Sequence, residues 1–142
     1  MANSAGELQW LPSLSIDGFP GAPLVFDKKT GGDVTSSPPK HRPGGMGPEV
    51  SYLALPVYSD VTLTRVYEQE RDQALIGELD PLCGTTYCTV TETPLTPTGT
   101  PAPFTPRTYR GRLANIKPGN VDSTSATPRM WEIDIVVESV AN

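Results

Sequence analysis

The segment 57–79 constrains the fold most, because its hydrophobic period changes from that of a strand to that of a helix within a few residues. In the first half, Val61 and Leu63 fall on one side of an extended chain, while Thr62 and Thr64 fall on the other. This alternation is typical of a strand with one buried face. We therefore expect Val61 and Leu63 in the core.

The second half of this segment predicts the one convincing helix, which begins near Glu68 and ends before Pro81. Leu75, Ile76 and Leu79 share one helical stripe, so we expect them to pack against a sheet. The first turn carries negative charge, which the helix dipole favours. The acidic residues concerned are Glu68, Glu70 and Asp72.

The C-terminal segment 129–140, RMWEIDIVVESV, predicts the strongest strand. One face is wholly apolar and supplies further core candidates: Trp131, Ile133, Ile135 and Val137. The other face carries Glu132, Asp134 and Glu138. Solvation is the simplest explanation of an acidic face, and a dedicated acidic surface is the alternative.

Further strand-like segments predict a mainly β chain with one α-helix. They are residues 8–17, 24–26, 49–55, 86–92 and 107–117. Arg110 and Arg112 lie on the polar face of the last segment. We expect them to pair across strands with the C-terminal carboxylates.

Two segments lack periodicity, and in the first of them we expect no regular element. The first, at about 27–48, contains two double glycines and a Pro-Pro step, and it concentrates the basic residues Lys28, Lys29, Lys40, His41 and Arg42. A solvated loop is one interpretation. Because such long loops are uncommon in compact domains unless they bind something, the other is an arm that binds a second copy of this acidic protein. The second segment, at about 93–106, is rich in Pro and Thr and cannot form a continuous ladder.

Length and composition limit the possible classes of protein. A chain of 142 residues with 37% hydrophobic content predicts a single domain over residues 1–142. The 16 Pro and 13 Gly favour loops that become ordered against neighbouring subunits, and the net charge of −5 weighs against general duplex binding. Without a membrane-length apolar run or a signal-peptide pattern, we expect no membrane partner and synthesis in a cytoplasm.

The sequence predicts neither an enzyme nor a cofactor or metal site. It shows no nucleophile elbow, and the glycine pairs beginning at Gly31 and Gly44 are turn residues rather than a phosphate-binding loop. His41 is the single histidine, too few for a usual metal-ligand set. Cys83 and Cys88 are interpreted as free thiols or as an incidental pair in a reducing compartment.

The order of these elements resembles the bacteriophage tail tube protein family. The matching motif before the helix comprises Leu55, Pro56, Tyr58, Val61, Thr62, Leu63 and Arg65. Asp122, Ser123 and Ser125 match a later motif, and the alternating acidic strand 132–138 follows it. The Pro/Thr-rich segment 93–106 is not part of the usual family pattern.

The resemblance implies a β-sandwich or split-barrel subunit, six copies of which close a ring with a continuous inner β-barrel. Stacked rings then form a hollow tail tube in the virion, assembled in the host cytoplasm. DNA passes through it without specific binding. The other implied partners are the tape-measure protein, a baseplate or tail-tip initiator, a tail terminator and a sheath.

Within such a tube, Glu132, Asp134 and Glu138 are candidates for a lumen wall that repels DNA. Lys28, Lys29, Lys40, His41 and Arg42 are candidates for ring stacking. A carbohydrate-binding or virion-decorating β-sandwich module is the alternative function, with Trp10 or Trp131 as a stacking face. The apolar register of Trp131 favours the core for that residue.

Overall fold

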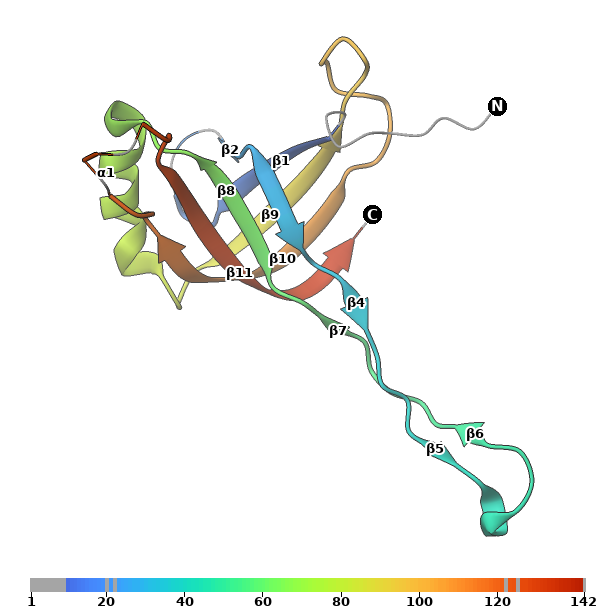
Figure 1. The fold of residues 1–142 in the computed structure, drawn as a ribbon. Helices are drawn as coiled ribbons and strands as arrows, with labels where there is room; N and C mark the ends of the chain where they lie inside the picture. The colour runs from blue at the N-terminus through green and yellow to red at the C-terminus, as the bar shows by residue number, and fades with distance from the viewer. Residues whose placement is uncertain (1–9, 20, 22, 122, 125, 142) are drawn as a thin grey trace.

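The computed structural model describes residues 10–141 apart from residues 20, 22, 122 and 125. Its main feature is one curled antiparallel sheet of seven strands, in the order β2-β1-β9-β10-β11-β8-β3 (Figure 1). The strands are β1 Trp10–Ile16, β2 Leu24–Val25, β3 Lys28–Gly31, β8 Val61–Val66, β9 Tyr87–Pro94, β10 Arg107–Lys117 and β11 Met130–Ala141. The helix α1 spans Gln69–Leu79 and continues into a short 3-10 turn, η3, at Asp80–Leu82. The prediction of a mainly β chain with one α-helix is confirmed.

The sheet nearly closes on itself, because its two outermost strands are neighbours in the sequence. Only Phe26 and Asp27 separate β2 from β3. The amide of Phe26 donates to the carbonyl of Pro12 in β1 at 3.0 Å, and the amide of Asp27 donates to that of Thr64 in β8 at 3.0 Å. The linker therefore joins both edges of the sheet, and the body is a split barrel.

Two irregularities in the longest strand pair accompany this curvature. The register of β10 against β11 shifts between Arg110 and Gly111 and again between Leu113 and Asn115. Bulges of this kind bend a strand and increase its local twist. They contribute to wrapping the sheet around its apolar face.

The apolar face lies inside the barrel. The six strand residues that the alternation assigns to the core are all buried: Val61, Leu63, Trp131, Ile133, Ile135 and Val137. Leu75 and Leu79 of α1 are also buried, and Ile76 packs partly against the same cluster. In the described part of the chain, no helix is long and apolar enough to span a bilayer.

A buried ion pair links the helix to the barrel interior. Arg65 follows Val61 and Leu63 on the inward side of β8, and its Nη2 lies 2.5 Å from Oδ1 of Asp72. The other carboxylate oxygen of Asp72 accepts the amide of Glu68 at 2.8 Å, which satisfies a free donor at the start of α1. Although burial raises the pKa of Asp72, these hydrogen bonds and that from Arg71 outweigh it and hold the pKa below its usual value.

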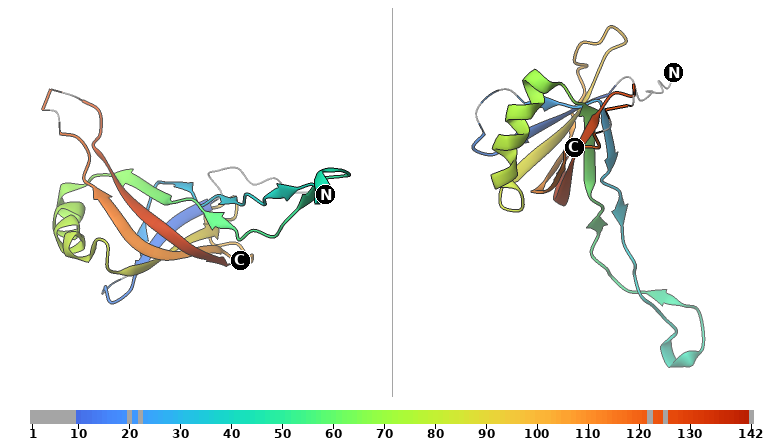
Figure 2. Two further views of the ribbon diagram at one scale, coloured as in Figure 1. Left: turned by 90° about the horizontal axis from the view of Figure 1, so that it is seen from below. Right: turned by 60° about the vertical axis from the view of Figure 1, so that its left-hand side comes forward.

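A long hairpin projects from the barrel (Figures 1 and 2). Two short ladders hold it together: β4 (Val34–Thr35) pairs with β7 (Val57–Tyr58), and β5 (Lys40–His41) pairs with β6 (Val50–Ser51). A 3-10 turn, η2 (Pro43–Gly45), lies at its tip. The expectation that residues 27–48 hold no regular element is therefore wrong, since residues distant in sequence pair there. The predicted strand 49–55 is the returning side of this hairpin.

Candidate assembly surfaces

The hairpin, residues 33–59 and hereafter the arm, leaves the barrel at a fixed root. Gly31 and Gly32 have φ values of 87° and 82°, a region that favours glycine. A Cβ on Gly31 would lie 1.8 Å from the carbonyl oxygen of Asp60, and one on Gly32 would lie 2.6 Å from Cε1 of Tyr109. Ser59 then closes the root by donating its amide to the Asp33 carbonyl at 2.9 Å. The double glycine therefore sets the direction of the arm.

The surface of the arm is rich in apolar side chains. It holds seven of the fourteen large apolar side chains that are exposed in the described part of the chain. They are Val34, Met46, Val50, Tyr52, Leu53, Leu55 and Val57. Leu53 is 97% exposed and Leu55 is 82% exposed. Exposed apolar surface gathered in this way commonly marks an interaction site.

The most exposed leucines lie where the arm's ladder is interrupted. Between the two ladders, residues 36–39 face residues 52–56, and Pro38, Pro39 and Pro56 have no amide hydrogen to donate. The amide of Tyr52 donates to the Pro39 carbonyl at 2.8 Å at one end of this gap. The middle of the arm therefore combines apolar side chains with an incomplete ladder.

The basic residues predicted on the arm are divided between two places. Lys40 and His41 are exposed in β5, and Arg42 lies 3.8 Å from Glu49 across the tip. Residues 33–59 hold two Lys or Arg and two Asp or Glu, so the formal charge of the arm is balanced.

Lys28 and Lys29, by contrast, lie in β3 of the barrel. Lys29 is partly buried, forms an ion pair with Glu92 and donates to the Tyr109 hydroxyl at 3.0 Å. Burial lowers the pKa of Lys29, but Glu92 and Tyr109 outweigh this effect and raise it. The expected concentration of positive charge on the arm is therefore wrong for these two lysines, which form part of the sheet.

The predicted acidic face exists, but two of its three carboxylates lie beside cations. Asp134 is only 9% exposed; it accepts a hydrogen bond from the Thr62 hydroxyl at 2.8 Å and lies 3.2 Å from Nζ of Lys117. Glu138 lies 3.9 Å from Nε of Arg112 and accepts a hydrogen bond from the Tyr87 hydroxyl at 3.3 Å. The cross-strand pairing of Arg112 is thus observed, whereas Arg110 pairs with Asp17 at the end of β1.

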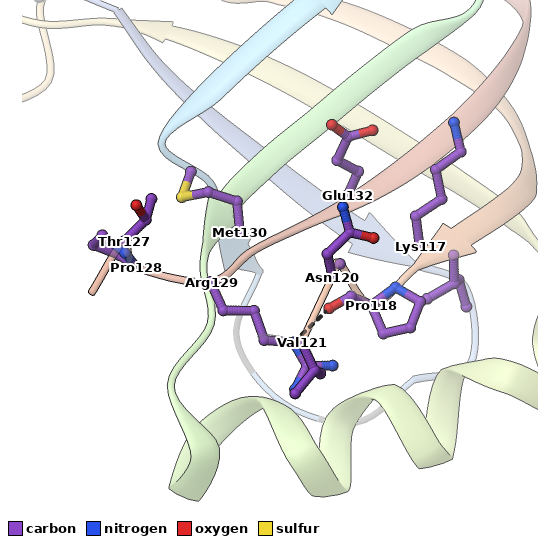
Figure 3. Close-up of a pocket in the computed structure, with 11 residues that line it drawn as sticks. Lys117, Pro118, Asn120, Val121, Thr127, Pro128, Arg129, Met130 and Glu132 are labelled. Atoms are coloured by element: carbon purple, nitrogen blue, oxygen red, sulfur yellow. Dashed lines mark hydrogen bonds between the residues drawn. The ribbon is translucent and has the colours of Figure 1, made fainter. Parts of the chain in front are cut away.

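Glu132 lines a wide hollow of about 840 Å³ beneath the β10–β11 turn. In Figure 3, Glu132, Asn120 and Lys117 lie beside one another on one side of it. Arg129 donates from Nε to the Pro118 carbonyl at 2.9 Å and stacks over the Tyr67 ring at 4.1 Å. The hollow lies at the helix end of the barrel and is lined by both polar and apolar side chains.

One side of β11 provides a further candidate surface. Its pairing with β8 ends at Ile135, whereas its pairing with β10 continues to Ala141. Among the described residues, no strand pairs with the other side of residues 136–141. Val136, at the start of this free edge, is 46% exposed. Such an edge is available for a strand from another chain.

Two other predictions are settled by the structure. Cys83 and Cys88 are free thiols; Cys88 is buried, which raises the pKa of its thiol to about 12. Trp131 is fully buried and offers no stacking face, whereas Trp10 is 40% exposed.

The sequence interpretation missed Leu53 and Leu55 as surface residues. A signal was present, because residues 50–59, VSYLALPVYS, combine apolar side chains with a complete lack of charge.

The chain resembles known proteins in fold and not in sequence. No family model matches the chain, and no curated protein matches it significantly. Among solved structures, a chain of the anti-feeding prophage baseplate, determined by cryo-EM with sixfold symmetry imposed, superposes with a TM-score of 0.71 at 17% identity. The match covers 99% of this chain and 96% of that one.

Two related assemblies contain similar chains. One is the sheath-tube complex of an extracellular contractile injection system, with a TM-score of 0.64, 14% identity and coverage of 97% and 90%. The other is the tube-terminating cap of the anti-feeding prophage, with a TM-score of 0.66, 10% identity and coverage of 99% and 91%. The chain has the fold of contractile injection system proteins. The predicted resemblance to a tail-like particle family is confirmed, because the solved structures with a similar fold are components of such particles.

Proposed function

We propose that this protein is the tube subunit of a phage-tail-like particle, a structural protein without catalytic activity. Its copies form hexameric rings, and the rings stack into a hollow conduit. The observation that carries the proposal is the arm: a fixed, projecting hairpin with exposed leucines, attached to a barrel whose fold is shared by components of contractile injection systems. The arm exposes apolar surface in a single copy, and a polymer covers it.

Ring closure is supported by the free edge of β11. A head-to-tail interface around a closed rotation axis pairs each such edge with the neighbouring subunit and leaves none exposed. Six copies arranged in this way form the continuous inner barrel of the proposal. The sixfold symmetry imposed on the similar baseplate structure is consistent with this number.

The polar face of β10 and β11 is the proposed lumen wall, with Glu132, Asp134 and Glu138 as its acidic members. Lys117 and Arg112 compensate two of these carboxylates locally. We therefore propose a wall with alternating charges, which offers passing DNA or tape-measure protein no continuous binding surface. This replaces the strongly anionic wall expected from the carboxylates alone.

The arm is proposed to reach the next ring. Lys40, His41 and Arg42 lie near its tip, while Leu53 and Leu55 lie along its middle, so the contact combines polar ends with an apolar centre. A baseplate or tail-tip initiator, a terminator and a sheath complete the proposed set of partners in the virion or particle.

A component of the tube end is the second candidate, favoured by the likeness to chains from a baseplate and a cap. Electron microscopy of the purified chain over a concentration series distinguishes the two. Long hollow fibres are expected for a tube subunit, and single rings for an end component. A chain that stays monomeric throughout, including with an initiator complex, contradicts both.

The role of the arm is tested by replacing residues 34–58 with a short Gly/Ser linker. We expect a folded, soluble chain that no longer assembles, because the barrel keeps its own core. Val121→Ser is the matched control, since Val121 is 77% exposed but lies outside the arm. Normal fibres from the linker variant would refute this role.

A further inference from the structure

The loop that joins β9 to β10, residues 95–106, is a second projection. It contains four prolines, and several internal hydrogen bonds fix its shape. The Thr96 amide donates to the Thr100 carbonyl at 2.7 Å, and the Ala102 amide donates to the Pro94 carbonyl at 2.9 Å. A loop held in this way loses little conformational freedom when a partner binds.

This loop and the arm project in opposite directions. In Figure 1 the loop rises above the barrel and the arm descends below it, and the right-hand view of Figure 2 shows the same arrangement. In copies stacked along this direction, the arm of one copy would point toward the loop of the next. Such a contact joins two different surfaces and therefore repeats head to tail.

The two projections are also chemically alike. Residues 95–106 and residues 50–59 contain no charged residue. Phe104 is 72% exposed on the loop, and Trp10, itself 40% exposed, pairs in register with Pro94 at its foot. Leu53 and Leu55 supply the exposed apolar side chains of the arm. Burying these surfaces against each other removes apolar area from water and leaves no charged group buried without a partner.

From this we infer that the β9–β10 loop of one copy is the receptor for the middle of the arm of a second copy, with Phe104 packing against Leu53 and Leu55. The inference rests on the proposed function, because it needs stacked copies. It assigns a role to the Pro/Thr-rich segment, which the tail-tube resemblance leaves unassigned. The occupant is another copy of this chain.

Cross-linking between differently tagged chains tests the contact. One chain carries Leu55→Cys and the other Phe104→Cys, both with Cys83→Ser to remove the accessible native thiol; Cys88 is buried. After co-assembly and mild oxidation, we expect a product that contains both tags in the assembled fraction. Pairing Leu55→Cys with Val121→Cys is the control and is expected to give no such product.

A second variant measures the importance of the contact. Phe104→Glu is expected to lower the assembled fraction about tenfold or more while leaving the urea midpoint of the monomer unchanged, because Phe104 is exposed in the single chain. Val121→Glu is its matched control. Assemblies that form without the cross-link and tolerate Phe104→Glu overturn this inference and leave the proposed function standing. A wild-type chain that never assembles overturns both.

Discussion

The barrel and the arm differ in the burial of their apolar side chains. In the barrel, Trp131 and Leu63 are fully buried, and even the inward-facing Arg65 has Asp72 as its partner. In the arm, Leu53 and Leu55 remain exposed and the ladder is incomplete beside them. One chain thus contains a region that buries its apolar side chains and another that leaves them exposed.

The largest effect on stability is expected from Asp72→Ala. The substitution leaves Arg65 buried without its carboxylate partner, and breaking a buried pair in this way costs about 3–5 kcal/mol. Urea unfolding followed by circular dichroism measures the change. Glu68→Gln is the control, because Glu68 pairs with Arg71 at the exposed surface; we expect it to cost less than about 1 kcal/mol. Equal losses of unfolding free energy in the two variants would show that the Arg65–Asp72 pair stabilises the barrel no more than an exposed ion pair does.

Gly32→Ala is expected to destabilise the junction between the two regions by about 1–3 kcal/mol. The new methyl group combines an unfavourable positive φ with a close approach to the Tyr109 ring. Gly44→Ala at the arm tip also has a positive φ, but its Cβ meets nothing within 4 Å. The difference between the two unfolding free energies isolates the contact with Tyr109, and no difference would argue against a fixed root.

A smaller, pH-dependent effect is expected from Asp134. Burial raises its pKa, but hydrogen bonds from Thr62, Lys117 and Asn115 outweigh burial and lower it. In the unfolded chain the Asp134 carboxyl group titrates at about pH 4. Its stabilising contribution is therefore complete above that pH and is lost as the pH falls through the lower pKa of the folded state. Urea midpoints measured from neutral to acidic pH should therefore fall less steeply in Asp134→Asn than in the wild type. Identical slopes contradict this assignment.

The smallest effect on stability is expected from the double variant Leu53→Ser, Leu55→Ser. Both side chains are exposed, so the free energy of unfolding should change by no more than about 0.5 kcal/mol. Assembly, followed by sedimentation and electron microscopy, should nevertheless be lost. A marked loss of monomer stability would show that the arm packs on its own barrel. The apolar side chains of the arm would then be buried in the single chain, as those of the barrel are.

Local periodicity predicts much of the barrel but little of the arm. The strand 107–117, the start of the helix near Glu68 and the inward faces of the last strands all follow from residues close together in sequence. The pairing of β4 with β7 depends on contacts between distant residues, and each of these strands has only two residues, too few for a period. Closure through Phe26 and Asp27 is likewise a property of the whole sheet.

The interior ion pair lies between these cases. Arg65 continues the inward register of Val61 and Leu63, and Asp72 precedes Leu75 and Leu79 at helical spacing, so both belong to apolar faces of their elements. These positions indicate two buried charges. They do not indicate that the charges meet, because that depends on how α1 packs against the barrel.

Hydrogen exchange of the backbone amides, in the dilute monomer and in the assembled state, tests the central claim most directly. We expect amides of the barrel strands to be protected in both states, because their ladders form within one chain. Amides in the middle of the arm, residues 53–55, should exchange fast in the monomer and become protected on assembly. Strong protection of the arm in the monomer, or no gain on assembly, would contradict the account.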